Sequence, residues 1–402
     1  MRMRRAARIV SFALILALSV IGLRTNSAAA VHRRASTGLA VIQLGSSYRG
    51  GSAYNRYGYA IVGPATAPLL RTFRGIGLVY ESSMELRVDC AGVACPTGVT
   101  YDEARRNGWV LTTASGAELV PRSYPAYRLA DVGNRAFQAR WAANVASLLR
   151  RTGAKGVFID QVLASVTVWS GGEVPAKYPT DSAWEAAMAD FVKNVGSTLK
   201  AKGFYVLASA HKYIANDHRS DSGELEAQWW TRLAPYVNGL LCEYWQQNPN
   251  DPGQPYFDGP GTSWLGNWTG WERLVSVTQR LGRDFFGLQY ASNATQQTLE
   301  YGRSSMLLRW NGRGGAYVGA SSDGSMLDVG AAWAADIGKP VGVAQRVGVG
   351  WRRLYTRGLV LVNPNPASAL TVPLRKRYKL PDGSVTGAAV TLPPVSGLIL
   401  RT

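Results

Sequence analysis

The chain has 402 residues, of which 46% are hydrophobic, 10% aromatic and 17% charged, and its formal net charge is +18. This composition is that of a globular protein and excludes a disordered or low-complexity chain. No run of lysine and arginine is interleaved with aromatic residues, so we expect no nucleic-acid partner. The positive charge favours either anionic polymers or simple solubility.

The N-terminus has the pattern of a signal peptide, which we assign to residues 1–30. Four arginines within the first eight residues form a basic segment, an apolar segment follows over 9–23, and small residues at 27–30 suit cleavage. The apolar segment is short for a membrane span, although a retained anchor stays an alternative. We therefore expect an exported protein that begins near Val31, is secreted or associated with the cell wall, and has a charge of +13 once five arginines are removed.

Eight short apolar runs alternate with helical patterns along residues 31–340. Apolar runs of this length between helices are typical of buried parallel strands. Eight such units predict an α/β fold, a (β/α)8 TIM barrel, rather than an open sheet. The predicted strands are Leu39–Gln43, Ile76–Glu81, Trp109–Thr112, Gly156–Asp160, Phe204–Ala208, Gly239–Glu243, Phe285–Tyr290 and Ser305–Trp310.

Two of the intervening helices are clear in the sequence. Apolar residues recur on one face over 134–151, and Gly153 ends that helix. The other begins at a capping box, Ser182–Glu185, and Gly203 ends it. These helices flank the predicted fourth strand and precede the fifth, as barrel topology requires.

The pattern changes after about Pro340, where short strands and turn signals replace the helices. This predicts a small antiparallel β-sandwich domain over 341–402, packed on the barrel domain of 31–340. The small domain has no obvious catalytic group.

The three cysteines fit an oxidising compartment. Cys90 and Cys95 are close together in a Gly/Pro-rich segment, which predicts a local disulfide. Cys242 is expected to pack inside a buried strand. No His/Cys cluster has metal-ligand spacing, and we expect neither a metal nor another cofactor.

Polar and aromatic residues stand at or just after the ends of several predicted strands. In an α/β barrel the carboxyl ends of the strands meet at one face, where the chemistry lies. Such a mixture suits sugars, because polar side chains bind hydroxyls and flat rings cover the C–H side of a sugar. For any one of these residues a loop cap is the alternative role. The candidate substrate-binding residues are Gln43, Tyr80, Glu81, Gln161, His211, Tyr244, Trp245, Tyr290 and Trp310.

Two of the predicted strands end in an acid, Asp160 and Glu243. Glycosidic cleavage needs one group that protonates the leaving oxygen, and a carboxylate that attacks the anomeric carbon or activates water. The two acids must therefore lie in different environments. We predict Asp160 and Glu243 as the catalytic pair, with Glu81 in reserve and a purely structural role as the alternative for each.

The stretch from Leu129 to Asp160 resembles a segment of TIM-barrel glycoside hydrolases, namely the hypothetical glycosyl-hydrolase-like families and the polygalactosaminidase-type enzymes. Their segment has an acid and an asparagine before a helix, here Asp131 and Asn134. After the helix it has Gly-(Val/Phe)-Phe-(Leu/Ile)-Asp, here Gly156–Asp160. The resemblance extends loosely to the rest of the mature chain through strand order and the closing β-sandwich.

The resemblance implies that Asp160 is the nucleophile and Glu243 the general acid/base. One departure matters, because those families often have a second acid directly after the first, whereas this chain has Gln161. If the second acid is required, activity is lost. If it only binds a substrate hydroxyl, Gln161 serves as well.

The sequence thus predicts a secreted, monomeric glycoside hydrolase that acts on a polysaccharide through two carboxylates. One alternative is a non-catalytic carbohydrate-binding barrel at the cell wall, which Gln161 keeps open. Another is an exported ester or peptide hydrolase that would use Ser209 or Ser165 with His211, although no Gly-x-Ser-x-Gly elbow precedes a helix.

Overall fold

The structure is a computed structural model that describes residues 38–44, 48–51, 54–90, 95–212, 222–248, 251–258, 268–290, 296–320 and 334–402. The predicted signal peptide and its cleavage site lie outside these residues. Among the described helices, none combines the length and the apolar character that crossing a membrane requires.

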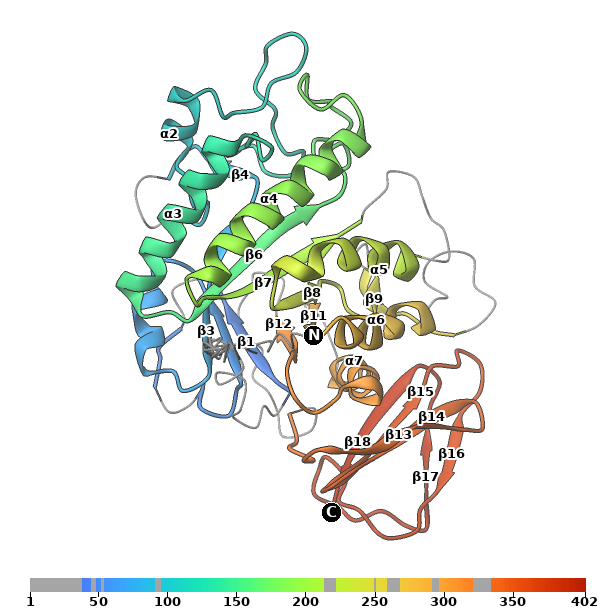
Figure 1. The fold of residues 1–402 in the computed structure, drawn as a ribbon. Coiled ribbons are helices and arrows are strands. Elements are labelled where there is room, and N and C mark those ends of the chain that lie inside the picture. Colours follow the sequence, from blue (N-terminus) through green and yellow to red (C-terminus); the bar gives the residue numbers. More distant parts are fainter. Residues whose placement is uncertain are drawn as a thin grey trace, which may run out of the picture.

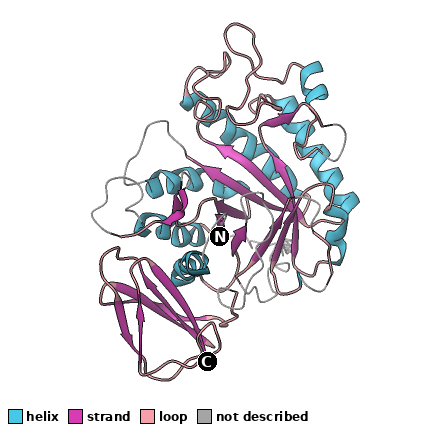
Figure 2. Ribbon diagram, turned by 180° about the vertical axis from the view of Figure 1, so that it is seen from behind, coloured by secondary structure: helices cyan, strands magenta, loops and turns pink. Residues whose placement is uncertain are grey.

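Eight parallel strands form one barrel sheet, which confirms the predicted fold class (Figures 1 and 2). Neighbours in the sheet follow chain order, and a bridge between Leu39 and Tyr317 brings the last strand back to the first. The strands are β1 (Ala40–Gln43), β2 (Tyr59–Val62), β3 (Ile76–Ser82), β6 (Gly156–Leu163), β7 (Tyr205–His211), β8 (Gly239–Cys242), β11 (Asp284–Tyr290) and β12 (Ala316–Ala320).

Helices cover the outside of the barrel (Figure 1). They are α3 (Arg135–Thr152), α4 (Asp181–Ala201), α5 (Ser222–Leu233), α6 (Trp268–Arg280) and α7 (Gln296–Arg309), and the 3-10 helix η2 (Ala67–Thr72) connects β2 to β3. Gly153 ends α3 in the left-handed conformation, as predicted. The cap of α4 differs from the prediction, because the side chain of Thr180, and not that of Ser182, accepts the amide of Ala183.

Shorter elements fill the connections between the strands. A long insertion between β3 and α3 contains β4 (Glu85–Arg87), α2 (Tyr101–Arg106) and β5 (Tyr127–Leu129). The 3-10 helix η4 (Ala234–Tyr236) precedes β8, and the ribbon of β9 (Gln247–Asn248) and β10 (Asp251–Pro255) follows it.

Two of the eight predicted strands are wrong. Trp109–Thr112 lies in the insertion, where Val110 and Thr112 make only isolated bridges. Ser305–Trp310 belongs to the end of α7, whose apolar residues are buried on two sides and therefore lack the one-sided pattern of a surface helix. The strands that take their places are the short β2 and β12.

Apolar side chains fill the interior of the barrel and the layer between barrel and helices. The interior cluster contains alternate residues of each strand, among them Ile61, Leu78, Phe158, Leu207 and Phe286. The intervening residues face the helices in a second, larger cluster. This alternation decides which side chains near the strand ends reach the site at the carboxyl ends of the barrel.

The C-terminal residues form two antiparallel sheets, as predicted (Figure 2). The larger sheet consists of β13 (Pro340–Val347), β14 (Gly350–Tyr355), β15 (Gly358–Asn363) and β18 (Ser396–Arg401), and the smaller of β16 (Leu370–Pro373) and β17 (Ala389–Leu392). A small apolar core lies between them, with Leu361, Val372 and Leu392 buried in it.

The larger sheet is attached to α7 by polar and apolar contacts. Arg353 donates to the carbonyls of Leu307, Leu308 and Trp310 at the end of the helix. A cation at this position also suits the negative end of the helix dipole. Tyr355 adds a bond to the carbonyl of Leu307, so the small domain is fixed on the barrel through α7.

Candidate active site

Asp160 projects into the barrel from β6. Phe158, two residues earlier, belongs to the interior cluster, so alternation points Asp160 to the same side. The register between β6 and β7 shifts just after this point, and Gln161 takes a φ of 60°, unusual for a residue other than glycine. A β-bulge thus follows the acid directly.

The Asp160 carboxylate is held by donors from several strands. The Tyr80 hydroxyl on β3 donates to Oδ2 over 2.9 Å. Burial raises the pKa of Asp160, while bonds from the Gln161 amide and from Tyr80 and Ser209, and the charge of His211, oppose this shift. The strained Gln161 backbone therefore contributes its own amide to the carboxylate.

Glu243 directly follows β8, and Tyr290 at the end of β11 holds it. The Tyr290 hydroxyl donates to Glu243 Oε1 over 2.8 Å. Tyr290 is itself positioned by Gln247, whose side chain accepts the Tyr290 amide over 2.8 Å and donates to its carbonyl. Tyr244, with a φ of 54°, packs its ring 5.1 Å from that of Tyr290.

His211 lies between the two acids. Its Nε2 is 3.6 Å from Glu243 Oε2 and 3.2 Å from the Ser209 hydroxyl, which also bonds to Asp160. Its Nδ1 is 3.6 Å from Oε1 of Glu226, a buried acid on α5 that also accepts the Lys212 amide. Burial lowers the pKa of His211, but Glu226, Glu243 and Asp160 outweigh it and the net shift is upward.

The two carboxyl groups differ in how well their charge is stabilised. Burial and the charge of Asp160 raise the pKa of Glu243, and only His211 and the Tyr290 hydroxyl oppose them. Asp160 has four opposing influences, including two hydroxyl donors and an amide. Because like charges in one site cannot both ionise easily, the charge of Asp160 favours the protonated form of Glu243.

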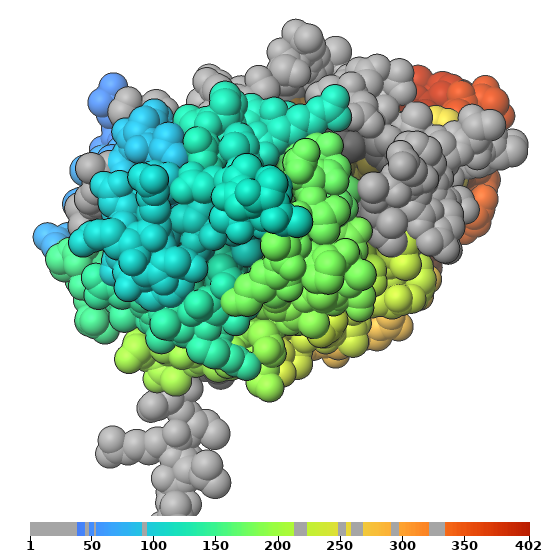
Figure 3. Space-filling view, turned by 90° about the horizontal axis from the view of Figure 1, so that it is seen from above, coloured from blue at the N-terminus to red at the C-terminus, as the bar shows by residue number. Residues whose placement is uncertain are grey.

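An aromatic surface lies beside the acids. The Tyr124 ring stacks on that of Trp169 with centroids 5.6 Å apart, and Tyr124 is 46% exposed. The charges of Glu85, Glu243 and Asp160 all act on the Tyr124 hydroxyl. The backbone amide of Arg122 donates to the carbonyl of Trp169 over 3.0 Å. In Figure 3 the teal region that includes the insertion before α3 lies against the green region that follows β6.

A third acid, Glu85, belongs to this surface. It accepts the indole N–H of Trp169 over 2.9 Å. Burial raises its pKa to about 7, and the charge of Asp160 adds to the shift although the Trp169 bond opposes it. The site therefore contains more carboxyl groups than the two predicted.

Five of the nine predicted binding residues, Tyr80, Gln161, His211, Tyr244 and Tyr290, lie around the two acids, and the other four do not. Gln43 bonds to Tyr54 on the outside of the barrel. The Trp245 indole donates to the Gly302 carbonyl on α7. The Trp310 indole donates to the Gly314 carbonyl, at the amino-terminal end of the barrel.

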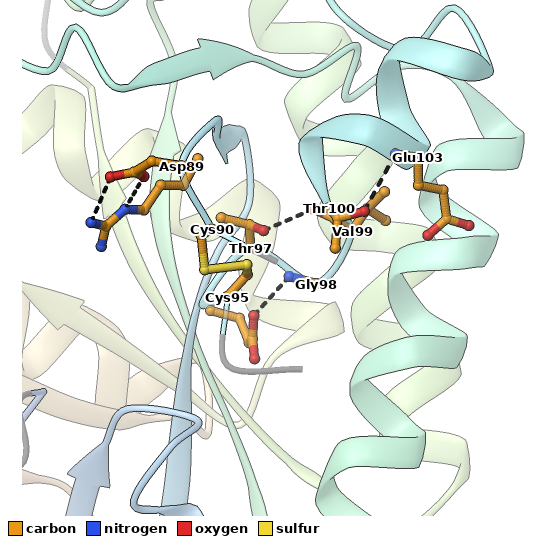
Figure 4. Close-up of a disulfide and its surroundings, with 10 residues drawn as sticks. Asp89, Cys90, Cys95, Thr97, Gly98, Val99, Thr100 and Glu103 are labelled. Atoms are coloured by element: carbon orange, nitrogen blue, oxygen red, sulfur yellow. Dashed lines mark hydrogen bonds and ion pairs between the residues drawn. A yellow bond between two sulfur atoms is a disulfide. The ribbon is translucent and has the colours of Figure 1, made fainter. Parts of the chain in front are cut away.

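Glu81 also faces away from the site, because its neighbour Tyr80 faces inward. Its Oε2 accepts the Gly98 amide over 2.7 Å, next to the Cys90–Cys95 disulfide (Figure 4). The side chain lines a cavity of about 240 Å³ between the disulfide loop and α3. Burial raises the pKa of Glu81 to about 8, but the side chain faces the helix side of the sheet and not the catalytic candidates.

Several residues around the candidate site were not predicted from the sequence. Glu226 has a weak signal, since it is an acid among the tryptophans and leucines of α5. Gln247, Tyr124 and Trp169 are in connections, where nothing in the sequence tells which strand end they approach. Among the described residues, no group of three or more His, Cys, Asp or Glu side chains is arranged to hold a metal ion.

Sequence comparison identifies the family. Residues 78–359 match hypothetical glycosyl hydrolase family 15, which spans most of the barrel and the start of the small domain. The chain belongs to this family. It is therefore a glycoside hydrolase. No curated protein matches the chain.

Several solved structures have a similar fold. A maltogenic α-amylase, AmyB from Thermotoga neapolitana, is 9% identical with a TM-score of 0.51, covering 92% of this chain and 99% of its own. A γ-CGTase from alkalophilic Bacillus clarkii is 12% identical with a TM-score of 0.44, covering 91% and 61%. An α-amylase from Malbranchea cinnamomea is 9% identical with a TM-score of 0.45, covering 86% of each chain. At these identities AmyB supports the fold alone.

Proposed function

We propose that this family member is an exported enzyme that cleaves O-glycosidic bonds of a polysaccharide with Asp160 and Glu243. The observation that carries the proposal is the network in which both acids share His211 and each has its own tyrosine hydroxyl. Two carboxyl groups in unlike surroundings, inside the carboxyl end of a barrel, are what glycoside hydrolysis requires.

The unequal surroundings divide the roles. Glu243 keeps its proton to higher pH and is placed to protonate the leaving oxygen. Asp160 has more donors to its carboxylate and is the ionised partner, which attacks the anomeric carbon or activates water. His211, as a cation, stabilises both acids in their ionised forms and holds the proton distribution between them.

A polymer is favoured over a single small sugar because the aromatic surface extends the site. Tyr124 and Trp169 offer a stacked, partly exposed platform beside the acids, where a further sugar ring would rest on its C–H face. Glu85 lies under this platform and would bind a hydroxyl of the same sugar. Export is supported by the N-terminal sequence pattern and by the Cys90–Cys95 disulfide.

The test is hydrolysis of a polysaccharide panel by the mature chain, residues 31–402, with Asp160→Asn as the paired variant. The panel includes galactosaminoglycans, galactans, arabinans and cell-wall extracts. We expect sugar release from one class of polymer and a loss of at least about a thousandfold in the variant, since the nucleophile or base is removed. The anomeric form of the first product, read by NMR, tells retention from inversion.

Two results would contradict the proposal. Asp160→Asn within tenfold of the wild type would remove this residue from the catalytic pair. Binding to a polymer without any hydrolysis would indicate a carbohydrate-binding barrel, and substitution of Gln161 by Asp or Glu would then test whether the missing second acid is the reason.

A further inference from the structure

The positive charge of the chain is concentrated in the small C-terminal domain. Residues 341–402 contain nine arginines and lysines and one aspartate, a formal charge of +8. Residues 31–340 contain 30 basic and 25 acidic residues, a charge of only +5. A charge spread for solubility alone would not gather in the smallest part of the molecule.

Three of the nine cations have a role in holding the fold together. Arg353 is buried and donates to the carbonyls at the end of α7. Arg357 pairs with Asp336 over 2.5 Å. Arg346 lies over the Trp351 ring, 5.6 Å from its centroid.

The other six cations have no acidic partner within the described part of the chain. The domain's one acid, Asp382, is engaged by the amide and hydroxyl of Ser384. Four of the six are exposed, and the other two are half-buried. These six, which we call the Tyr378 basic cluster, are Arg352, Arg375, Lys376, Arg377, Lys379 and Arg401.

The cluster surrounds Tyr378, which is buried in the small apolar core. Lys376 Nζ lies 5.2 Å from the centroid of the Tyr378 ring, and the charge of Arg352 also acts on this tyrosine. Lys379 exchanges backbone hydrogen bonds with Arg401, next to the C-terminus marked in Figure 2. The connection after β16, the middle of β14 and the end of β18 thus bring their cations together.

We propose that the Tyr378 basic cluster is a docking surface for an anionic glycan, a flexible polymer with repeating carboxylate, sulfate or phosphate groups. Neighbouring cations repel one another, and a polyanion relieves this repulsion while it releases its own counterions. Because the cluster is separated from the barrel acids by α7 and the larger sheet, docking and hydrolysis use different surfaces. The inference is independent of the proposed catalytic pair.

A glycan fits this surface better than a nucleic acid. Tyr378, the aromatic residue at the centre of the cluster, is only 5% exposed and offers no platform on which bases could stack. The described residues of this domain are strands and connections, without a helix that could enter a groove. A flexible polymer can instead follow the exposed connection of residues 375–379.

The test compares two triple variants of the full chain. One is Arg375→Gln, Lys376→Gln and Arg377→Gln, and its control is Lys193→Gln, Lys202→Gln and Arg280→Gln, which removes the same charge from exposed positions on the barrel helices. Binding is measured by fluorescence titration with polygalacturonate, dextran sulfate, a polyol-phosphate polymer and neutral dextran, at several salt concentrations. Duplex DNA is added as a competitor.

We expect the wild type to bind at least one anionic glycan, more weakly as salt rises, and not to bind neutral dextran. The cluster variant should bind at least about tenfold more weakly with a shallower salt dependence, and the control within about twofold of the wild type. The polymer that binds most tightly identifies whether the surface prefers carboxylate, sulfate or phosphate groups. Absence of wild-type binding, equal losses in both variants, or displacement of the glycan by DNA at equal charge would each overturn the proposal.

Discussion

The two ends of the barrel interior contain the same kinds of side chain in different arrangements. At the amino-terminal end, Tyr205 and Tyr59 both donate to one oxygen of Asp284, over 2.7 and 3.1 Å. At the carboxyl end, two acids divide two tyrosines between them, with Tyr80 on Asp160 and Tyr290 on Glu243. A histidine lies between the acids at the carboxyl end.

The difference shows how one set of residue types serves structure or chemistry. A single carboxylate that accepts hydrogen bonds from two phenolic hydroxyls has its negative charge stabilised by both. These bonds also join three strands at their first residues. Two carboxylates that share a cation and have one phenol each are close enough for the charge of one to raise the pKa of the other. The first arrangement stabilises the amino-terminal end of the barrel, whereas the second is suited to proton transfer by one of the two acids.

The largest expected effect is that of Glu243→Gln. This change removes the proposed acid, so glycosides with poor leaving groups should lose about 10²–10⁴-fold in kcat/KM. Substrates with an activated leaving group should lose much less, because their departure needs little protonation. The measurement is a series of aryl glycosides of graded leaving-group pKa, and an equal loss across the series would show that Glu243 is not the acid.

The next largest effect is expected for Glu81→Gln. This substitution tests whether an acid with a raised pKa can lie outside the catalytic site. Burial raises the pKa of Glu81 from 4.5 to about 8, so the folded protein is more stable when the Glu81 carboxyl group is protonated. This contribution is present below the unfolded value near 4.5 and is lost as the pH rises toward about 8. The stability of the variant relative to wild type should therefore increase by roughly 4 kcal/mol between pH 5 and pH 8.5.

Urea unfolding of both proteins at the two pH values checks this prediction, with Glu103→Gln on the nearby α2 as the control. Hydrolytic activity of Glu81→Gln should stay within about twofold of wild type, since Glu81 faces the helices. A large loss of activity without a loss of stability would contradict this prediction. It would indicate that Glu81 is part of the site, as its position at the end of a predicted strand suggests.

Glu226→Gln should shift the pH dependence rather than abolish activity. The substitution keeps an acceptor for the Lys212 amide but removes the negative charge that faces His211 Nδ1. His211 then loses its proton at lower pH, and the pKa values of Asp160 and Glu243 rise because their cationic neighbour is lost. We expect the acidic limb of kcat/KM to move up by about half to one pH unit.

The control for this change is Glu185→Gln, which removes an acid that pairs with Lys212 and Arg232 at the surface. Its pH profile should match that of the wild type. An unchanged profile in Glu226→Gln would mean that Glu226 does not set the charge of His211.

The barrel and the positions of both acids at its strands were predictable from the sequence, because each acid ends an apolar run of the kind that buried parallel strands have. The sequence could not decide which strand-end residue faces inward. Tyr80 and Glu81 are adjacent, and a shift of one position exchanges the interior for the helix side, so both were predicted and only Tyr80 reaches the site.

Contacts between connections that are distant in the chain could not be predicted from the sequence, for a different reason. Tyr124 and Trp169 meet because the insertion before α3 and the connection after β6 fold against each other. Neither connection has a periodic pattern that fixes its path. Likewise, the end of α7 was predicted as a strand because burial by the small domain removes its polar face.

The smallest effects come from a matched pair of substitutions, Tyr205→Phe and Tyr290→Phe. Each removes one phenolic hydroxyl, the first at the amino-terminal end of the barrel and the second at the carboxyl end. At the amino-terminal end we expect a loss of about 1–3 kcal/mol in unfolding free energy, because a buried bond to a carboxylate disappears, with activity within about twofold. At the carboxyl end the loss of the bond to Glu243 raises the pKa of that acid further, so kcat/KM should fall severalfold and its alkaline limb should move up. Because both substitutions remove the same atom from the same residue type, equal effects on activity would mean that the two ends do not differ in function.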